Sequence, residues 1–183
     1  MTLGWLPPTE SAGRRVEIDI RHQDILRAEA DALGCVVTPS LQPDDEASRQ
    51  IFAAAGVQLR EDIHWALTRR GRPRLEPGEG LTVAVRREYP VGRVGFLTLV
   101  ASAGGKAPEE RESLVIGAFL REALEWGFES VALPVSESGI EVSLAAAREI
   151  LERISDAERP LLRRLHFLAR DAALLERPGR GTA

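Results

Sequence analysis

Short apolar runs alternate with amphipathic segments along this 183-residue chain, and this order is the feature that most restricts its fold. Residues 32–38, for example, form a run rich in valine that fits a strand covered on both faces. The expected strands are 16–21, 32–38, 81–86, 93–100, 130–133 and 162–169. The expected helices are 45–55, 58–69, 109–126, 143–154 and 171–176. Strands that alternate with helices predict an α/β fold, a three-layer α/β/α sandwich.

Local signals set the expected helix boundaries. Gly56 separates the first two helices, and Pro108 suits the first turn of the longest helix. Ser143 is expected to cap the helix that follows it. Apolar residues at helical spacing predict one buried stripe, formed by Leu59, Ile63, Ala66 and Leu67.

The length of the chain fits one domain. Residues 1–14 contain two adjacent prolines and a polar stretch, which is typical of a flexible leader, and 177–183 read as a frayed tail. The single domain is therefore expected over residues 15–176.

Charge and composition exclude several classes of function. The chain has 24 basic and 28 acidic residues, a net charge of −4, which argues against nucleic acid or an anionic membrane as a partner. Its one cysteine, Cys35, excludes an internal disulfide framework and is expected to be a small buried core residue. With no signal peptide or membrane span in the sequence, a cytoplasmic location is expected.

The sequence lacks the common catalytic and cofactor motifs. It has no Walker A motif, no G-x-G-x-x-G, no G-x-S-x-G and no H-E-x-x-H, so no cofactor is expected. His22, His64 and His166 lie far apart without metal-ligand spacing. Gly104-Gly105-Lys106 precedes a helix and could hold a phosphate, but a plain loop is the simpler interpretation.

Several segments, in order and at the right separations, resemble the macro domain family of ADP-ribose-binding proteins. Gln-Asp-Ile at 23–25 and Asp-Ala-Leu at 31–33 are similar to the family's Gly-Asp-Ile and to the start of its Asp-Ala-Ile-Val-Asn-Ala-Ala-Asn strand. Residues 51–56 are similar to the helix that ends in Ala-Ala-Gly, and 78–80 fit a Gly-Glu-Ala position. Residues 132–140, Ala-Leu-Pro-Val-Ser-Glu-Ser-Gly-Ile, resemble the strand and loop Phe-Pro-Ala-Ile-Ser-Thr-Gly-Val/Ile.

The resemblance covers Val16 to about Glu176 and implies a mixed, mostly parallel central sheet. It also implies that Asp24 binds the adenine amino group, while two loops cradle the diphosphate and the distal ribose. The residues it marks as ligand-binding are Asp24, Ile25, Thr38, Ser136, Ser138, Gly139 and Ile140.

The chain departs from the family pattern where the diphosphate would bind. The family's two asparagines align with Cys35 and Thr38, its Gly-Gly-Gly-Val-Asp stretch with residues 44–48, and a strand histidine with Thr98. Side chains in place of glycine obstruct the close approach of backbone amides to phosphate. Losing two hydrogen bonds to a charged group, at about 1.5–3 kcal/mol each, lowers affinity roughly 10² to 10⁴-fold. We therefore expect a macro-like fold with a degenerate diphosphate site.

Three functions remain open at this point. The first is a binding module for ADP-ribose or a related nucleotide. The second is a hydrolase of ADP-ribose conjugates, in which Asp44 or Asp45 would have to act as the base. The third is a scaffold that has lost its ligand and binds a protein partner or a second copy of itself, for which Trp5 and Trp65 are candidate contacts.

A variant of the third function follows from the acidic residues of the two loops. If those loops converge, their carboxylates would line one crevice and attract Mg²⁺, Ca²⁺ or an amine. The residues concerned are Asp44, Asp45, Glu46, Glu137 and Glu141. The simpler interpretation is a set of solvated loop charges.

Overall fold

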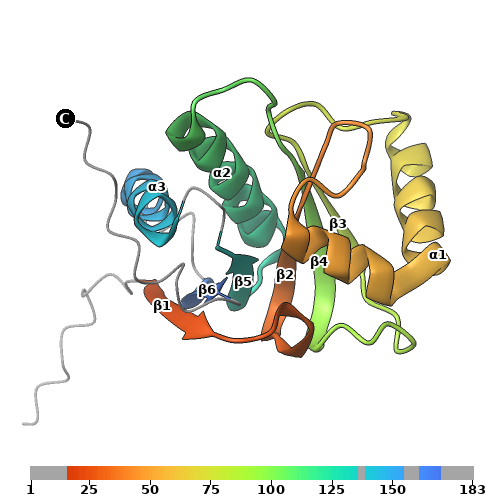
Figure 1. Cartoon of the computed structure of the whole chain (residues 1–183), viewed down its shortest axis with the longest axis horizontal. Coiled ribbons are helices and arrows are strands. Elements are labelled where there is room, and N and C mark those ends of the chain that lie inside the picture. Colours follow the sequence, from red (N-terminus) through yellow and green to blue (C-terminus); the bar gives the residue numbers. More distant parts are fainter. Residues whose placement is uncertain (1–15, 136–138, 155–160, 170–183) are drawn as a thin grey trace, which may run out of the picture.

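A six-stranded sheet organises the chain (Figure 1). The structure is a computed structural model that describes residues 16–135, 139–154 and 161–169. The strands are β1 (Glu17–His22), β2 (Glu29–Val37), β3 (Gly80–Ala84), β4 (Arg93–Ala101), β5 (Ser130–Pro134) and β6 (Arg164–Ala169). The helices are η1 (Ile25–Arg27), α1 (Glu46–Arg70), α2 (Pro108–Trp126) and α3 (Ile140–Arg153).

The strands lie in the order β1-β6-β5-β2-β4-β3. Neighbouring strands are parallel from β1 to β4, and only the edge strand β3 runs antiparallel to its neighbour β4. The sheet is therefore mixed and mostly parallel, as expected. The carboxyl ends of the five parallel strands meet at one edge of the sheet, the carboxyl edge.

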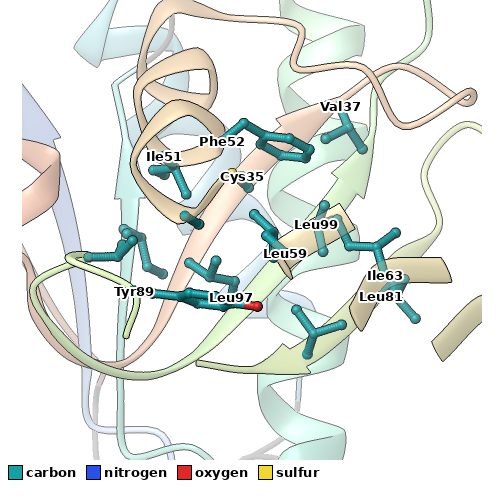
Figure 2. Packing of buried hydrophobic residues seen from close by; sticks show 14 of the residues in the cluster. Cys35, Val37, Ile51, Phe52, Leu59, Ile63, Leu81, Tyr89, Leu97 and Leu99 are labelled. Carbon is teal, nitrogen blue, oxygen red and sulfur yellow. The ribbon is translucent and has the colours of Figure 1, made fainter. Parts of the chain in front are cut away.

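Two hydrophobic clusters lie on opposite faces of the sheet. Leu33, Cys35 and Val37 of β2 belong to the cluster beneath α1, part of which Figure 2 shows. Ala32 and Val36 of the same strand belong to the cluster that α2 and α3 cover. Because side chains alternate between the two faces of a strand, β2 contributes to both clusters. Helices on both faces confirm the three-layer α/β/α sandwich (Figure 1).

Helix α1 consists of two helical pieces joined at Gly56. This glycine has φ 68° and ψ −152°, a conformation that side chains with a Cβ disfavour, so the predicted separation at Gly56 is confirmed. The predicted stripe of the second piece is also buried, at Leu59, Ile63, Ala66 and Leu67.

Helix α3 begins three residues before its predicted start. Its N-cap is Gly139, with φ 95° and ψ 163°, and its first residue is Ile140. The prediction that Ser143 caps this helix is therefore wrong. Ser143 is completely buried inside the helix, where its Oγ donates a hydrogen bond to Oε1 of Glu112 on α2 at 2.6 Å. A serine ahead of an apolar run is typical of a cap, and only the packing of α3 against α2 shows that its hydroxyl has another partner.

Other predicted elements agree with the structure within a few residues or lie outside it. The predicted strand 81–86 ends at Ala84, and the strand predicted from residue 162 begins at Arg164. The leader 1–14, the helix 171–176 and the tail 177–183 fall outside the described residues. Of the helices in the described ranges, none is both long and apolar enough to span a membrane.

Candidate functional site

The carboxyl edge brings together the loops that follow β1, β2, β4 and β5. Gln23, directly after β1, donates its backbone N–H to the carbonyl of Ala169 at the end of β6, at 3.1 Å. This bond places Asp24 next to the carboxyl edge. Thr38 follows β2, and Ser102 follows β4. In open α/β sheets this edge is where ligands bind, so these loops form the candidate site.

Asp24 is exposed and shapes the short turn after β1. Its Oδ1 accepts a hydrogen bond from the backbone N–H of Leu26 at 3.0 Å and thereby caps η1. The next predicted site residue, Ile25, is only 4% exposed and belongs to the core beneath α1. At this position the structure therefore presents a carboxylate to the surface and holds the apolar side chain inside.

The loop after β2 is closed by its own hydrogen bonds. The N–H of Leu41 donates to the carbonyl of Thr38, and the N–H of Thr38 donates to the carbonyl of Gln42. The Thr38 hydroxyl accepts from the N–H of Gln42 at 3.2 Å and lies 3.0 Å from the Ser40 hydroxyl. Asp44 continues the pattern, since its N–H donates to Val36 O. Backbone donors of this loop, and the Thr38 side chain, are thus already used within the protein.

The N-terminus of α1 is capped by Asp45. Its Oδ1 accepts a hydrogen bond from the N–H of Ser48 at 2.6 Å. Burial raises the pKa of the Asp45 carboxyl above its ordinary value, and the hydrogen bonds to Ser48 oppose that shift without cancelling it. A helix N-terminus is a natural site for a phosphate, and here a carboxylate of the chain occupies part of it.

The neighbouring acids have different partners. Oδ2 of Asp44 accepts a hydrogen bond from the Ser102 hydroxyl and lies 3.5 Å from a guanidinium nitrogen of Arg111, near the start of α2. Glu46 pairs instead with Arg49 and Gln50 on its own helix. Asp44 and Glu46, although two positions apart, therefore make separate sets of contacts.

The predicted acidic crevice receives no support as a metal site. Glu141 is exposed in the first turn of α3, and Glu137 lies outside the described residues. Within ranges 16–135, 139–154 and 161–169, no group of three or more His, Cys, Asp or Glu side chains is arranged to hold a metal ion. In addition, Arg111 places a cation beside Asp44, one of these carboxylates.

A small pocket of about 30 Å³ opens at the carboxyl ends of β2 and β5. Its lining comprises Val36, Asp45, Arg111, Glu112, Val115, Ile116, Leu133 and Pro134. Pockets that enclose drug-sized ligands measure about 300–1,000 Å³, so this one has room for water rather than for a nucleotide. A larger ligand would have to lie across the edge of the sheet.

The second predicted loop is described only at its end. Ser136 and Ser138 lie outside the described residues, while Gly139 and Ile140 begin α3. The side chain of Ile140 is 4% exposed and packs with the α2 and α3 cluster. The structure therefore brings Asp24, Thr38 and Gly139 to loops of the same edge and leaves the two serines as predictions.

Two residues of the site were not found from the sequence. Arg111 and Ser102 contact Asp44 although they lie 67 and 58 positions further along the chain. Neither belongs to a motif, and Arg111 stands among other charged residues at the start of a helix. Lys106, the cation that the sequence did single out, pairs with Glu110 instead.

Cys35, His166 and Thr98 are buried, whereas His22 and His64 are exposed. Thr98, which aligns with the family's strand histidine, is 1% exposed and lies within 3.0 Å of the Thr82 hydroxyl. Cys35 is buried as predicted, and burial raises the pKa of its thiol. His166 is also buried and contacts Asp19 on β1.

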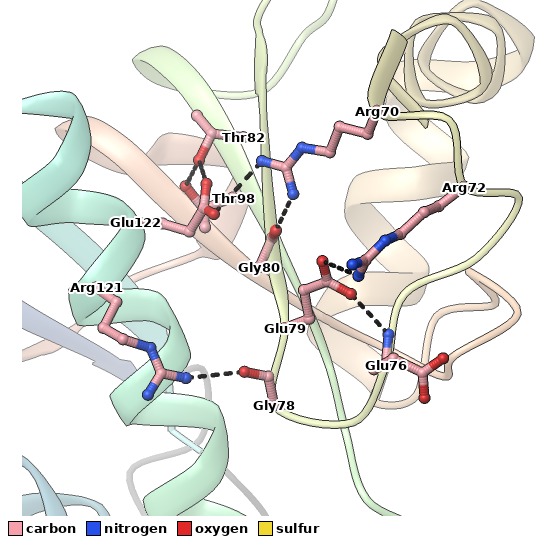
Figure 3. A network of polar contacts seen from close by, with 10 residues as sticks. All are labelled: Arg70, Arg72, Glu76, Gly78, Glu79, Gly80, Thr82, Thr98, Arg121 and Glu122. Carbon is pink, nitrogen blue, oxygen red and sulfur yellow. Dashed lines mark hydrogen bonds and ion pairs between the residues drawn. The ribbon is translucent and has the colours of Figure 1, made fainter. Parts of the chain in front are cut away.

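A larger cavity, of about 550 Å³, lies along the outer edge of β3 and is strongly polar (Figure 3). Arg70 donates to Gly80 O at 2.7 Å, and Arg121 donates to Gly78 O at 2.9 Å. Glu122, 8% exposed, accepts from the Thr82 hydroxyl and lies 3.5 Å from Arg70. Since unpaired edge carbonyls invite association with other strands, these side chains protect the edge of the sheet.

Comparison with known proteins bears on the fold. No family model matches the sequence, and no curated protein matches it. Among solved structures, a variant of the Oceanobacillus iheyensis macrodomain is similar, with TM-score 0.66 and 15% identity over 89% of this chain and 88% of that one. The macro domain of ganglioside induced differentiation associated protein 2 is similar with TM-score 0.68 and 16% identity over 87% of this chain and 80% of that one.

A third similar structure is a Trypanosoma brucei macrodomain in complex with ADP-ribose. It has TM-score 0.67 and 15% identity, over 91% of this chain and 69% of that one. The chain has the macrodomain fold.

Proposed function

We propose that this protein is a binding module for ADP-ribose or a related nucleotide, with a weak diphosphate subsite. The observation that carries the proposal is Asp24, an exposed carboxylate beside the carboxyl edge of a macrodomain fold. It occupies the position where the family resemblance expects the adenine-binding aspartate. The T. brucei macrodomain, which has the same fold, was solved in complex with ADP-ribose.

The weakness of the diphosphate subsite follows from the α1 N-terminus. Asp45 caps the helix, and the N–H of Asp44 is bonded to Val36 O. The N–H groups of Ser48 and Asp44 are therefore not open to a phosphate, and the Asp44 and Asp45 side chains add negative charge near it. Affinity is therefore expected in the millimolar range, about 10²-fold or more below a micromolar ligand.

Hydrolysis has less support than binding. The candidate bases Asp44 and Asp45 are both held by donors of the chain, from Ser102, Arg111 and Ser48. A base must reach a water beside the ligand, and in the free protein one oxygen of each carboxylate already accepts from these donors. A small molecule is proposed as the partner rather than nucleic acid or a membrane, in keeping with the net charge of −4, and a cytoplasmic location is proposed with it.

The proposal is tested by titration calorimetry with ADP-ribose at millimolar concentration. Binding is expected for the natural protein and is expected to fall about tenfold or more in Asp24→Ala, because a charge-assisted hydrogen bond to the ligand is lost. Glu29→Ala is the matched control. Glu29 is also an exposed acid and pairs with Arg93 at 3.4 Å. It is the first residue of β2 and lies at the end of that strand away from the carboxyl edge.

Two results would contradict the proposal. If no heat appears at millimolar ADP-ribose, the protein retains the fold without the nucleotide, and a partner-binding scaffold becomes the better explanation. If Asp24→Ala and Glu29→Ala weaken binding equally, the adenine assignment of Asp24 is wrong.

A further inference from the structure

Two donors at the carboxyl edge converge on one carboxylate oxygen. The Ser102 hydroxyl donates to Oδ2 of Asp44, and a guanidinium nitrogen of Arg111 lies 3.5 Å from that same oxygen. A guanidinium and a hydroxyl that meet at one point form a donor set suited to an oxygen of phosphate. In the free protein this point is occupied by an oxygen of the chain itself.

The Ser102 hydroxyl and the Arg111 guanidinium differ in their exposure to solvent. Ser102 is 2% exposed, and its own N–H donates to Val37 O at 2.8 Å, so its position at the end of β4 is fixed. The Arg111 side chain is 42% exposed and lines the pocket at the ends of β2 and β5. A ligand that arrives from solvent can therefore reach Arg111 directly and the Ser102 hydroxyl once Asp44 turns away.

Asp44 is able to leave without unfolding the loop. Its backbone is held separately, by the bond from its N–H to Val36 O, and its side chain is 28% exposed. Rotation of the side chain alone would move the carboxylate into solvent. The ion pair it gives up is long and partly exposed, and such pairs contribute little stability. It also gives up the hydrogen bond from the buried Ser102 hydroxyl, which an incoming phosphate oxygen would accept in its place.

We propose that Arg111 and Ser102 form a phosphate-binding pair that the Asp44 carboxylate occupies in the free protein. A phosphate or diphosphate group of the ligand displaces Asp44, so this loop acts as an internal competitor. The ligand's phosphate is thus recognised by a side-chain cation at a site where Asp45 already accepts the N–H of Ser48 at the helix N-terminus. That the phosphate belongs to a nucleotide rests on the proposed function. The arrangement of the Ser102 and Arg111 donors around Asp44 is independent of that function.

The test uses inorganic pyrophosphate, which has no adenine, and compares the natural protein with Asp44→Asn by calorimetry. Removing the competing charge is expected to raise pyrophosphate affinity about tenfold or more. Arg111→Gln added to Asp44→Asn is expected to cancel the gain, because the guanidinium is the donor that the gain depends on. Melting temperatures of all variants establish that each one is folded.

Glu46→Gln is the matched control, since it removes the same charge two positions away. The hydrogen bonds described for Glu46 come from Arg49 and Gln50 on its own helix, whereas Ser102 and Arg111 contact Asp44. Its pyrophosphate affinity is expected to stay within about twofold of the natural protein, because exposed charges contribute little. An equal gain in both single variants, or no gain in Asp44→Asn, overturns the proposal.

The same variants separate this proposal from the proposed function. One outcome is that Asp44→Asn binds pyrophosphate more tightly only when Arg111 is present, while ADP-ribose binding does not depend on Asp24. That outcome supports the phosphate pair and contradicts the nucleotide function. The other outcome is that ADP-ribose binding depends on Asp24 but is no tighter in Asp44→Asn than in the natural protein. That outcome supports the nucleotide function and overturns the phosphate pair.

Discussion

Adjacent residues have different roles in this protein. Asp44 and Asp45 follow one another in the chain, yet one contacts Ser102 and Arg111 and the other caps α1. The glycines also differ in the space around them. A Cβ on Gly80 would lie 2.4 Å from Cγ of the buried Glu122, whereas a Cβ on Gly104 would have no heavy atom within 4 Å.

This contrast predicts the effect of single substitutions. Gly80→Ala is expected to lower the free energy of unfolding by about 1–3 kcal/mol, because Glu122 must move away from Thr82 and Arg70. Gly104→Ala, the control in open space, is expected to change it by less than about 0.5 kcal/mol. Urea denaturation of both variants measures the difference, and equal stabilities would show that Glu122 can move at no cost.

At the scale of elements, the ends of the helices control the candidate site. Helix α1 begins with the Asp45 cap and bends at Gly56, and α3 begins at Gly139 with a positive φ. The starts of α1 and α3 follow loops of the carboxyl edge. The Asp45 cap therefore stabilises α1 and also takes the N–H of Ser48, which a ligand would otherwise be able to reach.

Substitution of the α1 cap separates its hydrogen bond from its charge. Asp45→Ala is expected to lower the free energy of unfolding by about 0.5–2 kcal/mol through loss of the cap. Asp45→Asn is expected to cost less, because its amide oxygen retains the bond to Ser48 and the unfavourable burial of a charge, which raises the pKa of Asp45, is removed. Thermal and denaturant unfolding measure both changes, and an equal loss in the two variants would show that the charge, not the cap, stabilises α1.

At the scale of the whole molecule, the sheet joins segments that are distant in the chain. β1 pairs with β6, and on these strands Asp19 faces His166, 147 positions later. Burial raises the pKa of the Asp19 carboxyl, but hydrogen bonds from His166 and Arg21 outweigh it and hold the pKa below its ordinary 3.8. The charged form of Asp19 therefore stabilises the pairing of these two strands.

The sign of this shift gives a dependence on pH. A carboxyl whose pKa is lower in the folded state stabilises the protein above its unfolded pKa, near 3.8, and the stabilisation disappears as the pH falls through the folded pKa. Asp19→Asn is accordingly expected to be less stable than the natural protein at pH 7, with a smaller difference at about pH 3. Urea denaturation at both pH values tests this, with the exposed Glu17→Gln on the same strand as control. A difference that does not shrink at low pH would contradict the role of the charge.

Local periodicity in the sequence predicted most of the fold. The strand and helix ranges, the break at Gly56, the buried stripe of α1 and the three layers depend on neighbours a few positions apart, which the sequence displays directly. The start of α3 escaped this reasoning because Gly139 caps it through a backbone conformation, while the serine that resembles a cap turns to Glu112 on another helix.

The chain's own order of residues thus determined most of its elements and its layers, and the resemblance marked Asp24, which the structure shows exposed in the turn beside the carboxyl edge. Only the tertiary structure decided that Ser102 and Arg111 meet Asp44, which gives one acid of the expected crevice a hydroxyl and a cation as partners. The physical reason is distance along the chain. Contacts between residues more than fifty positions apart depend on strand order and helix packing, and no local spacing in the sequence records them.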